Sequence, residues 1–207
     1  FTSDHGDMSG SQGVYKKQWP WNEAIKVPFV IRFPNLVSAG TIVEAPINVV
    51  DVMPTLLGLA GVPIPDAVEG IDLSPYLTGV RDDPPESVLI MNPCPFSIGD
   101  PRGHDQYPLF KGQRLEYRGV ITDRYTYVRT IDQPWLLYDN RKDPYQLDNL
   151  INNSHHLKTQ ERLDSFMQNH LRDIGDNFQP RDFYCERFGI EFDPRGKVVE
   201  LVENNYD

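Results

Sequence analysis

The chain has 207 residues, of which 39% are hydrophobic and 11% aromatic, so it can bury a core and is not a disordered segment. Its formal net charge of -10 argues against nucleic acid as a partner, because phosphate neutralisation requires clustered lysines and arginines. No apolar run reaches the ~18–20 residues of a membrane span, since Asp51, Pro54 and Pro63 interrupt the best candidate, residues 47–64.

The first half of the chain predicts alternating strands and helices. A short β-branched and aromatic start ends in the turn Ser3-Asp4-His5-Gly6, as at the end of a strand. Residues 27–33 are a continuous apolar run, which is typical of a buried parallel strand. A helix is predicted over 49–60, where Gly61 ends it, and a short strand over 88–91. The alternation indicates the edge of an α/β sheet.

The second half predicts a different arrangement. A long connection rich in proline and glycine follows the strand at 88–91, and connections of this length are usually functional or disordered. Three short strand patterns separated by turns then predict a β-meander, at 117–122, 125–130 and 135–138. Apolar residues at helical spacing from Leu163 to Ile174 predict a helix stopped by Gly175. A final strand is predicted over 198–202.

Three side chains near the start could share one chemical task. Asp4 and His5 are neighbours, so both can bind one metal ion only if the chain turns, and Gly6 permits a turn. Lys17 follows closely enough to reach an anion on that metal. Taken singly, each residue favours a structural interpretation: a capping aspartate, a surface histidine and a solvated lysine. The combination, with the motifs that follow it, favours a site.

The ordered set of motifs resembles the sulfatase family, in the alkaline phosphatase superfamily. The matching segments are Ser3-Asp4-His5-Gly6, Lys17, and residues 23–28, 51–57, 59–63, 70–73, 77–79, 118–127 and 137–150. The resemblance covers residues 1–175 and implies an α/β fold. Its parts would be the C-terminal part of an alkaline-phosphatase-like sheet sandwich and a small antiparallel sheet with a packed helix.

The resemblance also implies how the chain is divided. Residues 1–95 would form the C-terminal part of the α/β catalytic domain, and residues 96–177 a C-terminal α+β subdomain. Residues 178–207 would be an extended tail.

The resemblance gives the three N-terminal side chains specific roles. Asp4 and His5 would bind a divalent cation, usually calcium in this family, and Lys17 would contact the sulfate. A cation and an ammonium around one sulfate would stabilise the charge that develops on its oxygens. The residue types alone favour zinc, manganese or iron, because imidazole is an unusual calcium ligand; we follow the resemblance to calcium. Arg102 and His104, in the long connection, could bind substrate or simply be solvated.

Two parts of a sulfatase site are expected to lie outside this chain. The family makes its formylglycine from a Cys/Ser-x-Pro-x-Arg motif, which neither Cys94 nor Cys185 fits. The Asp82-Asp83 pair lies in a proline-rich turn and indicates a solvated loop. We therefore expect the nucleophile and the remaining metal ligands in an N-terminal half of the same enzyme. The chain alone should not hydrolyse a sulfate ester.

Other distinctive side chains are expected to be structural. Cys94 and Cys185 could pair, although two free cysteines are favoured. Trp19, Trp21 and Trp135 are expected to pack in a core or interface and not to line a sugar or aryl site.

Three functions remain open. We favour a sulfatase that acts on a sulfated small molecule or glycan. A phosphodiesterase or phosphonate monoester hydrolase of the same superfamily is the first alternative. A non-catalytic carbohydrate- or protein-binding module on the same scaffold is the second. No signal peptide is visible, and the compartment stays open between periplasmic, secreted and cytoplasmic.

Overall fold

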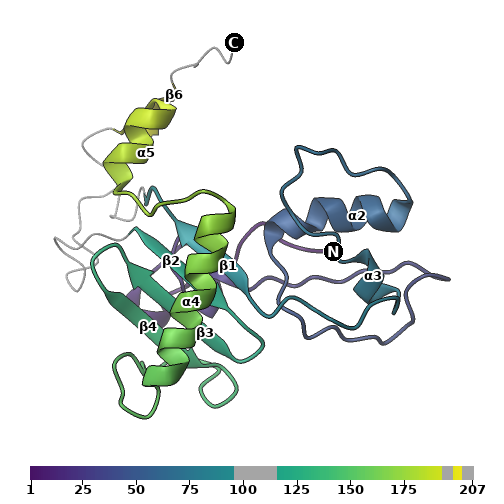
Figure 1. Ribbon diagram of the computed structural model, residues 1–207, viewed down its shortest axis with the longest axis horizontal. Coiled ribbons are helices and arrows are strands. Elements are labelled where there is room, and N and C mark those ends of the chain that lie inside the picture. The colour runs from purple at the N-terminus through teal and green to yellow at the C-terminus, as the bar shows by residue number, and fades with distance from the viewer. Residues whose placement is uncertain (96–115, 193–197, 202–207) are drawn as a thin grey trace.

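A four-stranded antiparallel sheet forms the centre of the computed structural model, which describes residues 1–95, 116–192 and 198–201 (Figure 1). The strand order is β1-β2-β3-β4. The strands are β1 (Val88–Asn92), β2 (Tyr117–Ile121), β3 (Tyr125–Thr130) and β4 (Pro134–Asp139). The predicted meander is therefore confirmed as β2, β3 and β4. The predicted strand at 88–91 also exists, but it pairs antiparallel with β2 and so does not edge a parallel sheet.

One face of the sheet is covered by helix α4 (Leu157–Asp173). Its buried residues Leu163, Met167 and Leu171 recur every fourth position, so they form one stripe along the helix. This stripe packs against buried residues of all three meander strands, among them Val120 and Leu137. The predicted helix is confirmed, and Gly175 follows it with a left-handed φ of 69°.

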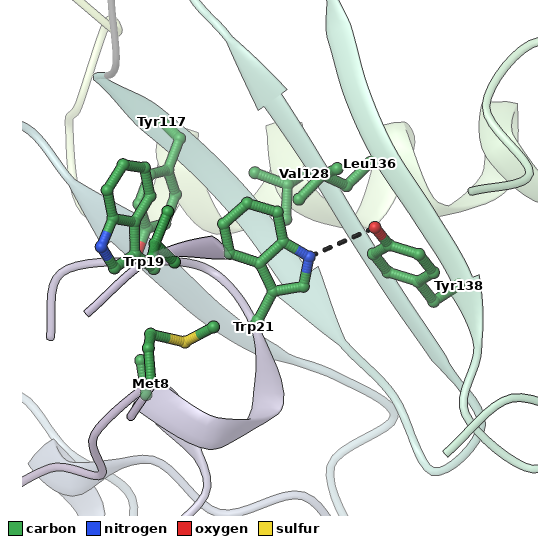
Figure 2. Packing of buried hydrophobic residues seen from close by; sticks show 9 residues of the cluster. Met8, Trp19, Trp21, Tyr117, Val128, Leu136 and Tyr138 are labelled. Carbon is green, nitrogen blue, oxygen red and sulfur yellow. Dashed lines mark hydrogen bonds between the residues drawn. The ribbon is translucent and has the colours of Figure 1, made fainter. Parts of the chain in front are cut away.

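The other face of the sheet is covered by the N-terminal segment, residues 8–25 (Figure 2). Trp19 and Trp21 are only 2% and 4% exposed, and they pack at the centre of this cluster. The indole N–H of Trp21 donates to the hydroxyl of Tyr138 on β4 at 3.2 Å. The remaining buried members of the cluster are Met8, Val14, Ala24, Tyr117, Val128 and Leu136. The expected packing of Trp19 and Trp21 is confirmed, and Trp135 packs against the same cluster.

Two helices lie to one side of the sheet in Figure 1, α2 (Val52–Ala60) and α3 (Ser74–Leu77). A 3-10 turn over Val49–Asp51 precedes α2. A capping box closes the start of this turn: the Asn48 side chain accepts from backbone N–H groups of the turn, and the Asp51 carboxylate accepts from the Asn48 N–H. Gly61 ends α2 with a left-handed φ of 66°. The helix predicted over 49–60 is thus confirmed.

The apolar run at 27–33 is not a buried parallel strand, and this prediction is wrong. Among the described residues, the strand pairing of this run is a single antiparallel bridge, between Thr2 and Phe29. Val30 in the middle of the run is 60% exposed. A buried parallel strand needs parallel partners and cover on both faces, and the described residues supply neither to this run.

The segment from residue 178 onward is not simply extended. It contains helix α5 (Arg181–Phe188) and the hairpin of β5 (Ile190–Phe192) with β6 (Val198–Leu201). The predicted final strand is confirmed as β6. Helix α5 forms because Pro180 can precede its first turn and Gly189 ends it with a φ of 61°. The division of the chain at residues 95 and 177 stays a prediction.

No helix in the described part of the chain combines the length and the apolar character needed to cross a membrane.

Candidate functional site

The turn that carries Asp4 and His5 is held by a close backbone contact at Gly6. The Gly6 N–H donates to the carbonyl of Ala24 at 2.9 Å, beside helix α1 (Asn22–Ile25). A Cβ atom on Gly6 would lie 1.9 Å from the carbonyl oxygen of Glu23. Glycine is therefore required because the two backbones approach closely, and the left-handed glycines of this chain do not include it.

A folded loop then returns the chain to the turn. The Met8 N–H donates to the Lys16 carbonyl at 2.9 Å, which closes the loop, and Met8 and Val14 are buried beneath it. The Gln12 side-chain amide donates to the Gln146 carbonyl at 3.0 Å, so the loop is also tied to the segment after β4. These contacts place Lys17 next to the turn.

The three predicted side chains converge. The ammonium of Lys17 lies 2.9 Å from Nε2 of His5. The nearer carboxylate oxygen of Asp4 lies 3.4 Å from the same nitrogen. The predicted convergence of Asp4 and His5 is confirmed. The strand-like start before them is paired through Thr2, which forms an antiparallel bridge with Phe29.

The hydrogen bonds assign a tautomer to His5. Its Nδ1 lies 2.7 Å from the Gly6 carbonyl, which can only accept, so Nδ1 carries a proton. Nε2 then holds a lone pair that accepts from the Lys17 ammonium. The alternative, Nε2 donating to Asp4, uses the longer distance of 3.4 Å and needs a doubly protonated ring. The shorter contact favours a neutral imidazole with its lone pair turned toward Asp4 and Lys17.

Asp4 is ionised and open to ligands. Hydrogen bonds from the backbone N–H groups of Asp4 and His5 lower the pKa of this carboxyl. Its side chain is 82% exposed, whereas that of His5 is 37% exposed.

A carboxylate oxygen and an imidazole lone pair facing the same space suit a divalent cation. However, no group of three or more His, Cys, Asp or Glu within the described ranges could hold a metal ion. The donors of Asp4 and His5 thus fit part of a metal site, and a complete coordination shell would need further ligands.

The other predicted site residues are not part of this cluster. Arg102 and His104 lie outside the described residues. Asp82 is exposed, and Asp83 accepts from the guanidinium of Arg81 at 2.8 Å, as expected of a surface loop.

The sequence did not predict the role of Gln146, which holds the start of α1 beneath the turn that carries Asp4 and His5. Its side-chain oxygen accepts from the Asn22 N–H at 2.8 Å, and its amide donates to Thr126 and Asn140. No local pattern reports such a contact, because Gln146 and Asn22 are 124 positions apart.

Comparison with known proteins agrees with these features. The family model for N-sulphoglucosamine sulphohydrolase, C-terminal, matches residues 10–87. An ulvan-active sulfatase from Formosa agariphila is 36% identical over 99% of this chain. The chain belongs to the sulfatase family. It is a C-terminal sulfatase portion, and it spans only 38% of that relative's length.

Solved structures confirm the fold class. A protein solved in complex with its substrate D-glucosamine-2-N,6-O-disulfate superposes with a TM-score of 0.64 and 23% identity, over 85% of this chain and 34% of that protein. The phosphonate monoester hydrolase from Silicibacter pomeroyi superposes with a TM-score of 0.64 and 23% identity, over 98% of this chain and 38% of that protein. At this identity both show a shared fold alone. The sequence identity to the ulvan-active sulfatase favours the sulfatase over the phosphonate hydrolase.

Proposed function

We propose that the whole protein to which this sulfatase portion belongs hydrolyses sulfate esters. The observation that carries the proposal is the cluster of Asp4, His5 and Lys17, in which Nε2 of His5 lies 2.9 Å from the Lys17 ammonium and 3.4 Å from a carboxylate oxygen of Asp4. Such a cluster suits an anion held between a cation and an ammonium.

The chain's own residues would divide the task as follows. Asp4 and His5 would hold a divalent cation, which when bound polarises a sulfate oxygen. With Nε2 of His5 engaged in this way, Lys17 loses the acceptor it now has at 2.9 Å. Its exposed ammonium is then free to bind the sulfate.

We propose calcium as that cation, following the family, although a histidine ligand is more usual for zinc, manganese or iron. Activity of the whole protein after chelation and re-addition of each metal tests this assignment. Restoration by calcium supports it, and restoration by zinc or manganese alone contradicts it.

The nucleophile, expected to be a formylglycine, and the remaining metal ligands are proposed to lie in an N-terminal half of the same enzyme. An apolar surface supports this proposal. Val49, Met53 and Leu56 are 68%, 55% and 50% exposed, at a spacing that places them on one side of α2 and its preceding turn. Apolar side chains that cluster on a surface and are this exposed mark a surface that another part of the protein covers.

A sulfated sugar is the substrate class to test first, because one structural relative is solved with a sulfated glucosamine as its substrate. Arg102 and His104 stay candidates for binding it. The experiment assays the whole protein on glucosamine 6-sulfate, an aryl sulfate, a phosphodiester and a phosphonate monoester.

Preferred release of sulfate supports the proposal. Faster cleavage of the phosphonate or phosphate ester favours the related hydrolase. Tight glycan or protein binding without turnover of any ester favours a binding module.

A further inference from the structure

Two cysteines that are far apart in the sequence lie in contact beside helix α5. Cys94 follows the end of β1 by two residues, and Cys185 lies within α5. Their sulfur atoms are 3.6 Å apart, although the residues are 91 positions apart. A disulfide has a sulfur–sulfur distance of about 2.05 Å, so a modest side-chain rotation would close the gap.

The meeting of the thiols is built into the fold, because α5 is anchored from several sides. The fully buried Arg118 of β2 donates to Asp176 at 2.6 Å and to the hydroxyl of Tyr184 at 3.0 Å. Tyr184 immediately precedes Cys185. The N–H of Arg181, at the start of α5, donates to the buried carboxylate of Glu116 at 2.9 Å. These contacts hold α5 against the sheet whether or not the sulfurs are bonded.

We propose that Cys94 and Cys185 form a redox-active pair, whose oxidation to a disulfide ties α5 to the end of β1. The sequence alone favoured two free cysteines, since nothing about their spacing suggests a zinc ribbon or a redox motif. The distance between their sulfur atoms is the observation that changes this.

The oxidant is a low-molecular-weight disulfide such as oxidised glutathione. One protein thiolate attacks it, forming a mixed disulfide and releasing one reduced glutathione. The second protein thiolate then attacks the protein sulfur of the mixed disulfide and releases the second glutathione. The two electrons and two thiol protons of the protein pass to glutathione, and the protein gains one sulfur–sulfur bond.

The environment predicts the order of attack. Burial raises the pKa of the Cys94 thiol to about 12, and its contact with Cys185 adds to the effect. Cys94 is therefore almost entirely protonated at neutral pH and makes a poor first nucleophile. The mixed disulfide should form on Cys185, and Cys94 should complete the bond.

The test uses the whole protein, equilibrated in buffers of increasing oxidised-to-reduced glutathione ratio. Free thiols are then blocked with N-ethylmaleimide, and the protein is digested without reduction and analysed by mass spectrometry. We expect a cross-linked peptide pair containing Cys94 and Cys185, which disappears when reductant is added. Cys94→Ser and Cys185→Ser must each lose it.

A second readout examines the tether. We expect the oxidised protein to resist proteolysis after Gly175 at least several-fold better than the reduced protein, and the double serine variant to show no such difference. Two results would overturn the proposal: labelling of both thiols by maleimide at every glutathione ratio, or their recovery only as mixed disulfides with glutathione. A cross-link that leaves proteolysis unchanged would overturn the tethering of α5.

Discussion

Replacing Gly6 by alanine should damage both the fold and the site. The added Cβ would meet the Glu23 carbonyl oxygen at 1.9 Å, a separation that carbon and oxygen atoms do not tolerate. The backbone of α1 must retreat by about 1 Å, because the repulsion rises steeply at this distance. The retreat also breaks the 2.9 Å hydrogen bond from Gly6 to Ala24.

The expected loss of unfolding free energy is about 2–4 kcal/mol, from overpacking together with one lost backbone hydrogen bond. A displacement of Asp4 and His5 by this distance should also lower the rate by ~10²-fold. Urea unfolding followed by tryptophan fluorescence measures the first effect directly, because Trp19 and Trp21 lie in the core beside the turn. A steady-state assay of the whole protein measures the second.

Gly13→Ala is the matched control for this substitution. Gly13 has a left-handed φ of 75°, and nothing lies within 4 Å of the position of its added Cβ. It should cost about 1–2 kcal/mol through backbone strain and leave the rate unchanged. If Gly6→Ala were as stable as the wild type to within ~0.5 kcal/mol, the close contact with α1 would not hold the turn.

Three further predictions follow from the same contacts. Lys17→Ala should lower sulfate ester hydrolysis by ~10²–10³-fold, whereas Lys16→Ala should change it by less than about threefold; kinetics on both variants decide, and the reverse order would shift the site by one residue. Gln146→Leu should lower the unfolding free energy by about 2–4 kcal/mol, because it removes the three hydrogen bonds of a buried side chain and leaves the Asn22 N–H without its acceptor; an unchanged urea midpoint would refute this. Hydrogen bonds from Arg124 lower the pKa of the buried Asp139 in the folded chain. The ionised carboxylate therefore stabilises the fold fully above its pKa in the unfolded chain, about 3.9, and this stabilisation is lost as pH falls through the lower pKa of the folded chain. Acid unfolding of Asp139→Asn should therefore lose part of this pH dependence, and an unaltered profile would contradict the assignment.

Local patterns predicted the elements whose burial follows a simple period. The meander strands and α4 each bury a stripe that repeats every second or every fourth residue, and such stripes are visible in the sequence. Helix α2 was predicted because Gly61 marks its end.

The failures share one physical cause. The sequence pattern of a continuous apolar run such as 27–33 does not show whether a neighbouring strand or another part of the protein covers the run. Likewise, the pairing of β1 with β2 depends on a partner beyond a long connection, which no short window contains.

The site was predicted more fully than its support. The order of motifs placed Asp4, His5 and Lys17 together, and the structure brings the Lys17 ammonium to 2.9 Å from Nε2 of His5. The reason for Gly6 was different from the one expected, since its role lies in a close approach to Glu23 and not in an unusual φ. Contacts of this kind join distant segments, so they are visible only in the folded chain.

The meander is part of the support of the candidate site. The turn with Asp4 and His5 rests on α1, and α1 follows directly from Trp21, whose ring is buried against β3 and β4 (Figure 2). Gln146, after β4, holds the first residue of α1 through its backbone N–H. The position of the turn therefore depends on residues more than a hundred positions away. A substitution on the face of the meander that packs against residues 8–25 should displace the candidate site as well as lower stability. A substitution on the opposite face, which packs against α4, should mainly lower stability.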